Sequence, residues 1–149
     1  MEEEVMSERD DPDWIPRERE ESLCPCKSRM SYKECCMPFH HGKAKPEIAE
    51  QLMRSRYSAY FFRKVDYLVE TTHPRTRDAN LWEELDKTID QVNWKFLKIL
   101  ATSKGGKEDK KGKVEFVADY YVEGEEYELH ECSRFLRYKG TWKYLDGKG

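Results

Sequence analysis

Residues 24–36 read Cys-Pro-Cys-Lys-Ser-Arg-Met-Ser-Tyr-Lys-Glu-Cys-Cys and contain four of the five cysteines of the 149-residue chain. A structural zinc ion explains this density, because zinc takes four tetrahedral ligands and thiolates suit it well. Four protein ligands leave no coordination position for water, which is typical of a site that stabilises a fold. The stretch therefore predicts a structural Zn²⁺ site formed by Cys24, Cys26, Cys35 and Cys36.

Other interpretations of the cluster remain open at this point. A disulfide framework is disfavoured in a reducing cytosol, and the adjacent Cys35 and Cys36 cannot pair with each other without strain. His40 and His41 follow Cys36 by four and five residues, so either could replace one thiolate. A redox pair or an accidental cluster is the third alternative.

The charge of the chain changes from segment to segment around this cluster. Residues 1–22 contain ten acids and three bases, residues 23–46 contain five bases and one acid, and residues 47–149 contain nineteen of each. We therefore expect a disordered acidic tail (1–22), a basic zinc element (23–46) and a neutral folded body (47–149). The tail either acts as a solubilising leader or folds back onto the zinc element or a partner through Trp14 and Ile15.

The apolar stretches of the chain are short. None approaches the roughly 18 to 20 residues that span a bilayer, and the acidic start Met1–Glu4 does not resemble a secretory signal. We expect a cytoplasmic protein without membrane insertion.

The order of the motifs resembles a known family. Cys-Pro-Cys, eight residues and Cys-Cys look like the SEC-C zinc motif, which also occurs in the C-terminal tail of the SecA translocation ATPase. The motifs that follow, and the whole stretch from about Leu23 to Gly147, are similar to the YchJ family: residues 53–60, 66–68, 72–74, 76–77, 114–118, 130–131, 133–135, 140–142, 144 and 146–147. The resemblance implies a SEC-C element followed by an NTF2-like domain, a cone of curved antiparallel sheet closed by helices.

The sequence departs from that pattern at two points. The motif usually has glycines where Lys27 and Arg29 stand, and a side chain at a position of positive φ is sterically costly. Many relatives also carry a second SEC-C element after the cone, whereas this sequence stops at Gly149.

The body is predicted to be an α+β domain from its residues alone. Helix formers after Pro46 predict a first helix over Glu47–Phe62, followed by helices over Val65–Thr72 and Asn80–Ile89. Aromatic and β-branched residues then predict four strands, over 94–101, 114–122, 127–138 and 141–145. The Lys-rich segment Ser103–Gly112 between two of them is interpreted as a solvated hairpin loop rather than a phosphate site.

Polar residues fall on the apolar face of the third predicted strand. Alternation places Glu131 and Ser133 on the same face as Leu129 and Phe135, where buried polar groups need partners. We expect Glu131 to meet Arg56 of the first helix, either as a buried ion pair or as part of a ligand pocket. Further candidates for that pocket are His130 and His73 near its mouth and Trp94, Tyr120 and Trp142 in its walls.

The sequence favours a non-enzymatic adaptor that docks a protein partner through the zinc element. The resemblance implies contact with chaperones, translocation components or ribosomes. Phosphate loops, nucleophile elbows and metalloprotease helices are absent, and Cys132 is interpreted as a packing residue. The alternatives are a small-molecule-binding or enzymatic cone around Glu131, and nucleic-acid or ribosome binding through the basic zinc element. Pairing of two copies through the open sheet is expected for such cones.

Overall fold

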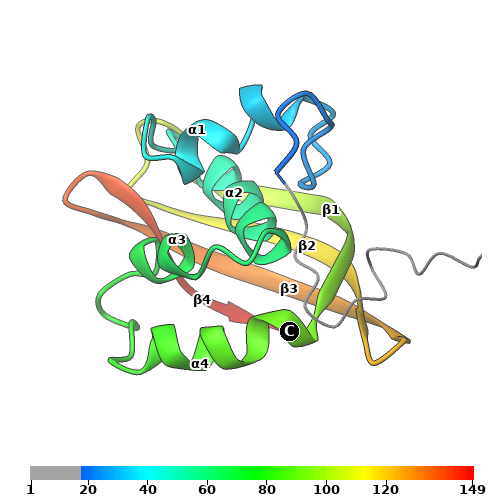
Figure 1. Cartoon of the computed structure of the whole chain (residues 1–149). Helices are drawn as coiled ribbons and strands as arrows, with labels where there is room; N and C mark the ends of the chain where they lie inside the picture. Colours follow the sequence, from blue (N-terminus) through cyan, green and yellow to red (C-terminus); the bar gives the residue numbers. More distant parts are fainter. Residues whose placement is uncertain (1–17) are drawn as a thin grey trace, which may run out of the picture.

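The computed structural model describes residues 18–149 of the chain (Figure 1). The predicted acidic tail, with Trp14 and Ile15, lies mostly outside these residues. The elements in chain order are the 3₁₀ turn η2 (Tyr32–Glu34), the helices α1 (Met37–His40), α2 (Ala49–Phe61), α3 (Val65–Glu70) and α4 (Leu81–Thr88), the 3₁₀ turn η3 (Ile89–Gln91), and the strands β1 (Asn93–Lys104), β2 (Lys111–Val122), β3 (Glu125–Tyr138) and β4 (Thr141–Lys148).

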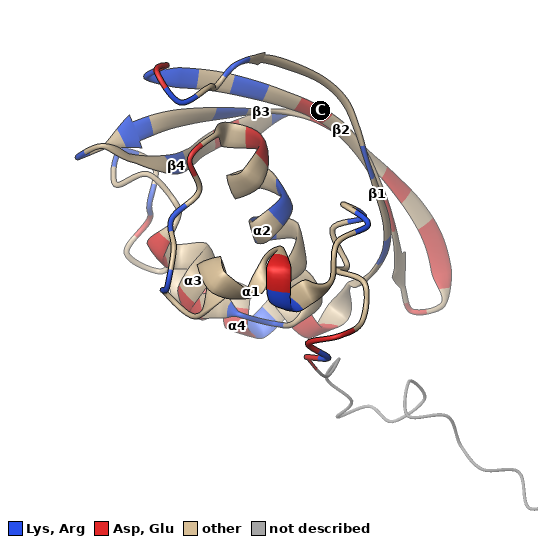
Figure 2. Cartoon of the chain, turned by 90° about the horizontal axis from the view of Figure 1, so that it is seen from above, with Lys and Arg blue, Asp and Glu red and all other residues tan. Residues whose placement is uncertain are grey.

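The strands form one antiparallel sheet in the order β1-β2-β3-β4. The register shifts within β1, between Ile99 and Ala101, and within β3, between Arg134 and Phe135. Irregularities of this kind bend and twist a sheet. The sheet accordingly curves around α2, which lies on its concave side (Figure 2).

Helix α2 packs into this concave side and is buried on more than one of its faces. It contacts β1, β2 and β4; its Leu52 belongs to the core shared with the sheet, and its Ala59 belongs to a second cluster shared with α3. On the sheet, the alternating Val114, Phe116 and Ala118 of β2 are at most 5% exposed, as the period-two pattern predicts. The second, smaller cluster of buried apolar residues joins α2 and α3 to η3.

The predicted α+β cone with three N-terminal helices and four strands is confirmed. The structure adds the short α1 between the cysteines and α2. It also extends β1 and β2 into the segment predicted as a loop, which leaves only residues 105–110 between them. No helix in residues 18–149 is long and apolar enough to cross a membrane.

The two edges of the sheet differ in their surroundings. Along β4, the Tyr144 N–H donates to the Thr71 carbonyl at 2.8 Å, and the Tyr144 carbonyl accepts from His73 N–H at 2.7 Å. The chain after α3 therefore covers part of the β4 edge. Strand β1 has β2 as its one partner within the described residues.

The β1–β2 turn touches the start of α2 through small residues. Ala49 N–H donates to the Gly105 carbonyl at 2.9 Å, and a Cβ on Gly112 would lie 2.5 Å from Gly105 Cα. Only glycine fits at position 112 in this approach of two backbones.

The substitution Gly112→Ala is expected to destabilise the protein by about 1 to 3 kcal/mol, the usual cost of overpacking. Gly106→Ala is the matched control, because a Cβ there meets a single side-chain oxygen at 3.4 Å. Urea denaturation followed by tryptophan fluorescence measures both. Equal stability of the two variants would contradict the predicted contact.

Candidate metal centre and polar cavity

Two short turns bring the cysteine pairs together. Cys24 N–H donates to the Met30 carbonyl at 2.8 Å, and Leu23 bridges Ser31, so residues 23–31 form a small loop. Ser31 then caps η2, which ends at Cys35. We call residues 18–41 the knuckle, because its contacts begin with Glu18, which pairs with Lys64, and end with α1.

The four thiols of the knuckle meet at one point. The Sγ atoms of Cys24, Cys26, Cys35 and Cys36 all lie within 4.8 Å of one another. The separation is 3.5 Å from Cys26 to Cys35 and 3.8 Å from Cys35 to Cys36. Zinc–sulfur bonds of about 2.3 Å in a tetrahedron place neighbouring sulfurs about 3.8 Å apart. The sulfur positions therefore fit a tetrahedral metal, and the adjacent Cys35 and Cys36 point toward the same centre.

The proton distribution among these thiols also favours a cation. Hydrogen bonding, chiefly from Cys24, lowers the pKa of the Cys26 thiol. The pKa of Cys36 is raised, first through its contact with Cys24. Without a cation the cluster cannot hold four thiolates at such short range, whereas a metal ion stabilises all four together.

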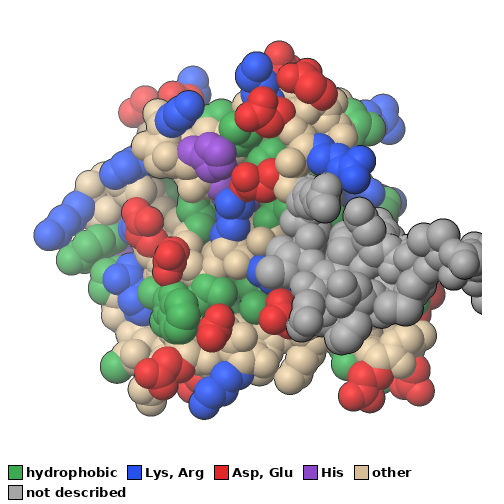
Figure 3. Space-filling view, viewed as in Figure 1, with side chains coloured by type: hydrophobic (Ala, Val, Ile, Leu, Met, Phe, Trp, Pro, Cys, Tyr) green, Lys and Arg blue, Asp and Glu red, His purple; other side chains and the backbone are tan. Residues whose placement is uncertain are grey.

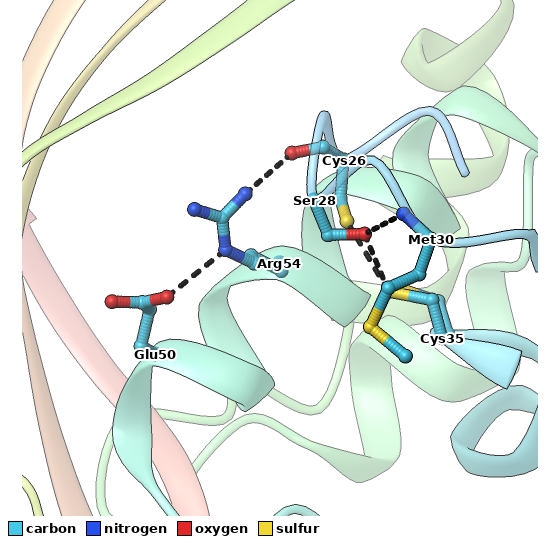
Figure 4. Close-up of polar contacts among 7 residues, drawn as sticks. Cys26, Ser28, Met30, Cys35, Glu50 and Arg54 are labelled. Atoms are coloured by element: carbon cyan, nitrogen blue, oxygen red, sulfur yellow. Dashed lines mark hydrogen bonds and ion pairs between the residues drawn. The ribbon is translucent and has the colours of Figure 1, made fainter. Parts of the chain in front are cut away.

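Three side chains that the sequence analysis did not select surround the sulfurs. Ser58 Oγ of α2 lies 3.4 Å from the Sγ atoms of both Cys24 and Cys36, and Ser28 Oγ lies 3.1 Å from Cys35 Sγ. Arg54 Nη1 donates to the Cys26 carbonyl at 2.7 Å, and its Nε donates to Glu50 (Figure 4). Ser28 belongs to the knuckle itself, whereas the position of Arg54 and Ser58 on α2, facing the knuckle, depends on docking that a local motif does not encode.

The histidine alternatives to the four cysteines are not supported by the geometry. His40 Nε2 donates to the Ser55 carbonyl at 2.7 Å, and Nδ1 lies at hydrogen-bond distance, 2.6 Å, from the Tyr32 hydroxyl. Both ring nitrogens are therefore engaged, and burial lowers the pKa of His40 to about 4. His41 is exposed and lies 3.6 Å from Glu18. His40 joins the knuckle to α2 instead of binding the metal.

The positions where the motif usually carries glycine are strained. Lys27 has a φ of 66° and Arg29 a φ of 73°. Both side chains are exposed, so neither offsets the strain by burial. The sequence-based expectation of a steric cost at these two positions matches the backbone.

The structure corrects the predicted contact between Arg56 and Glu131. Both residues line a cavity of about 210 Å³ between α2 and the sheet. No ion pair joins them within residues 18–149: Arg56 Nη1 donates to the Leu68 carbonyl at 2.8 Å and to the hydroxyls of Thr71 and Thr72, while Glu131 accepts from Ser133 at 2.7 Å. The C-terminal end of α3 and the two threonines after it supply these acceptors to Arg56. Sequence spacing does not reveal this contact.

Of the other predicted pocket residues, Ser133 and Trp94 line the cavity and the rest are placed elsewhere. His130 alternates to the outer face of β3, where it contacts Glu115 at 2.8 Å. Trp142 is fully buried near the start of α2, and its Nε1 donates to the Glu47 carbonyl. Tyr120 packs between Trp94 and Tyr127 outside the residues that line the cavity. His73 stacks on the edge of Tyr138.

The combination of a four-cysteine knuckle and a curved cone agrees with known proteins. The family model described as "YchJ, middle NTF2-like domain" matches residues 48–147. The chain belongs to the YchJ family. It is 44% identical to a UPF0225 protein of Streptomyces coelicolor over 84% of this chain and 94% of that protein. It is 38% identical to one of Geobacter sulfurreducens over 86% and 80%, respectively.

Two solved structures of SEC-C motif containing proteins resemble this YchJ-family chain. The protein from Rhodopseudomonas palustris superposes with a TM-score of 0.78 at 33% identity, over 86% of this chain and 98% of that one. The protein from Psychrobacter arcticus gives a TM-score of 0.71 at 27% identity, over 85% and 82%. In both cases the likeness covers more of the chain than the residues 48–147 that the family model matches.

Replacing the strained residues with glycine is expected to stabilise the knuckle. Lys27→Gly or Arg29→Gly should each raise the free energy of unfolding by about 0.5 to 1 kcal/mol, because relief of left-handed strain exceeds the entropic cost of glycine. Lys33→Gly, within η2, is the control and should lower stability. Urea denaturation in zinc-containing buffer checks the signs, and destabilisation by all three changes would refute the strain assignment.

His40 is expected to make stability fall on acidification. Its folded pKa of about 4 lies below the ordinary value of 6.5, so between these pH values the unfolded chain binds a proton that the folded chain does not. The loss reaches about 3 kcal/mol near pH 4. Protonation of the thiolates also destabilises the fold, but equally in His40→Gln. The wild type should therefore lose more stability than His40→Gln from pH 6.5 to 4.5, and parallel losses would contradict the assignment.

Proposed function

We propose that this protein is a non-enzymatic adaptor in which structural zinc stabilises the knuckle, and the knuckle and strand β1 together bind an extended acidic segment of a partner protein. The observation that carries the proposal is a groove of about 1190 Å³ between the knuckle and α2 on one side and β1 on the other. Zinc would supply crosslinks between the two cysteine pairs and no reaction chemistry.

Within residues 18–149, the edge of β1 that faces away from β2 pairs with no other strand, and β1 forms one wall of this groove. All seven consecutive residues from Asn93 to Ile99 line it. Successive side chains of a strand point to opposite faces, so only the backbone edge can present seven neighbours to one groove. Unpaired N–H and C=O groups on such an edge accept an added strand, which is a common mode of peptide recognition.

The charge of the groove favours an acidic partner. Six of its lining residues are basic, and no Asp or Glu within residues 18–149 lines it: Arg19, Lys27, Arg29, Arg54, Lys95 and Lys98. Elsewhere the charges are mixed, and on the face shown in Figure 3 basic and acidic side chains are interspersed. Concentration of one sign in a groove steers and selects a partner of the opposite sign.

Aromatic residues supply the apolar part of the groove. Trp94 and Phe96 of β1, Phe61 of α2 and the following Phe62 line it, and Phe96 is 41% exposed. Exposed aromatic side chains are enriched at binding sites because they bury a large apolar area. A segment that alternates acidic and apolar residues matches both the charges and these rings.

A fluorescein-labelled peptide of twelve residues, alternating glutamate with valine and one tyrosine, tests the proposal. The full-length protein should bind it in fluorescence anisotropy, and the double variant Lys95→Glu/Lys98→Glu should weaken binding at least tenfold. Lys113→Glu, an exposed position on β2, is the control with a single charge reversal outside the groove. Methylation of alternate peptide nitrogens should abolish binding, because it removes the donors of an added strand.

The zinc part of the proposal is measured separately. Elemental analysis should find one zinc per chain, lost in Cys24→Ser/Cys26→Ser and retained in Cys132→Ser. Peptide affinity should fall with the zinc, since the knuckle forms one wall of the groove. If the wild-type protein contains zinc but does not bind the peptide, the docking role is refuted. If the zinc-free variant binds the peptide as tightly as the wild type, the role of the metal is refuted. Tighter binding of a fifteen-nucleotide uridine RNA than of the peptide would identify nucleic acid as the partner instead.

A further inference from the structure

The cavity beneath α2 is separate in composition from the metal centre. It has a volume of about 210 Å³, and its walls come from α2 and from the inner faces of all four strands. Most of the wall is apolar or aromatic, including Met53, Phe116, Leu129 and Phe135. Two opposite charges, Arg56 and Glu131, lie in the same cavity.

Arg56 enters the cavity with part of its hydrogen-bonding capacity unused. The residue is 7% exposed, and its guanidinium lies 4.5 Å from the centre of the Tyr144 ring. All of its hydrogen bonds in the described chain come from Nη1, which donates to Leu68 and the hydroxyls of Thr71 and Thr72. The remaining donors, on Nε and Nη2, donate to no acceptor within residues 18–149, and neither is a buried atom left without a partner. They are therefore available to water or to a ligand in the cavity.

Glu131 faces the same cavity from β3 without a cation beside it. One carboxylate oxygen accepts from Ser133 Oγ at 2.7 Å, and the carboxylate packs against Gly147 of β4, where a Cβ would clash with it. Within the described residues no Lys, Arg or His forms an ion pair with Glu131. Each charge in this cavity therefore keeps hydrogen-bonding capacity that faces the cavity, where water or a ligand can satisfy it.

We propose that this cavity binds a small molecule of zero net charge that presents a hydrogen-bond acceptor next to a donor on an apolar body, as a carboxamide or an amino acid zwitterion does. The acceptor meets Arg56 and the donor meets Glu131. A simple anion is attracted by Arg56 but repelled by Glu131, and a simple cation meets the reverse, so neither is favoured.

The size of the cavity limits this ligand. A volume of about 210 Å³ equals the share of roughly seven liquid waters, which corresponds to about seven to ten non-hydrogen atoms. The apolar and aromatic wall favours a flat hydrocarbon body. Benzamide has this size and carries adjacent acceptor and donor groups, while benzoate and benzylamine are matched probes of nearly the same shape with a single charge.

The three probes are titrated into the full-length protein while the indole resonances of the tryptophans are followed by NMR. Benzamide should shift the Trp94 indole signal with a millimolar dissociation constant, as expected for a ligand of about nine non-hydrogen atoms. Benzoate and benzylamine should bind at least tenfold more weakly. Failure of all three to perturb Trp94, or tighter binding of either charged probe, would overturn the proposal.

A variant that changes the charge of the cavity tests how the cavity selects between ligands, in addition to how tightly it binds them. Glu131→Gln keeps the shape of the side chain and can still accept from Ser133, but it leaves the cavity with the positive charge of Arg56. The ratio of benzoate to benzamide affinity should rise at least tenfold in this variant. Glu128→Gln, an exposed position on the same strand, should leave the ratio unchanged. An unchanged ratio in folded Glu131→Gln would show that the carboxylate does not select the ligand.

Discussion

The packing of the four-cysteine cluster against α2 is the contact on which the rest of the structure depends. Cys24, Cys26 and Cys36 are at most 2% exposed and belong to the same buried cluster as Leu52 of α2 and Leu97 of β1. The knuckle and the cone therefore share one core. A structural metal in such a place contributes to folding of the whole domain, because its ligands form only when the core does.

Helix α2 connects the two sites of the molecule. One side carries Arg54 and Ser58, which contact the cysteines, and the other carries Arg56, which enters the cavity under the sheet. Residues two apart on a helix point in different directions, so neighbouring positions serve different sites. Loss of the knuckle is expected to change the position of α2 and hence the cavity, although none of the four clustered cysteines lines the cavity.

Charge is distributed unevenly over the molecule. A net charge of −3 describes no part of the chain, because basic residues gather along the groove beside β1 while the β2–β3 end of the sheet carries Glu123, Glu125, Glu126 and Glu128. The two edges of the sheet are also unequal, since residues after α3 cover part of β4. An exposed strand edge beside a basic wall is a specific surface, in contrast to a diffuse positive field.

Local sequence alone determined the four-cysteine cluster, the order of helices and strands, and the polar residues on the inner face of β3, because metal-ligand spacing and side-chain periodicity are short-range properties. The resemblance to the SEC-C motif, which usually has glycine at these positions, located the strain at Lys27 and Arg29, since glycine is the residue that a left-handed turn prefers. The tertiary structure decided which side chains meet across the fold. Arg56 contacts the end of α3 instead of Glu131, and His40 bridges Tyr32 to α2. Ser58 reaches the sulfurs, and Arg54 reaches the Cys26 carbonyl. These contacts depend on how α2 is docked against the knuckle and the sheet. The packing of the whole core sets that docking, and the residue pattern of a single segment does not determine it.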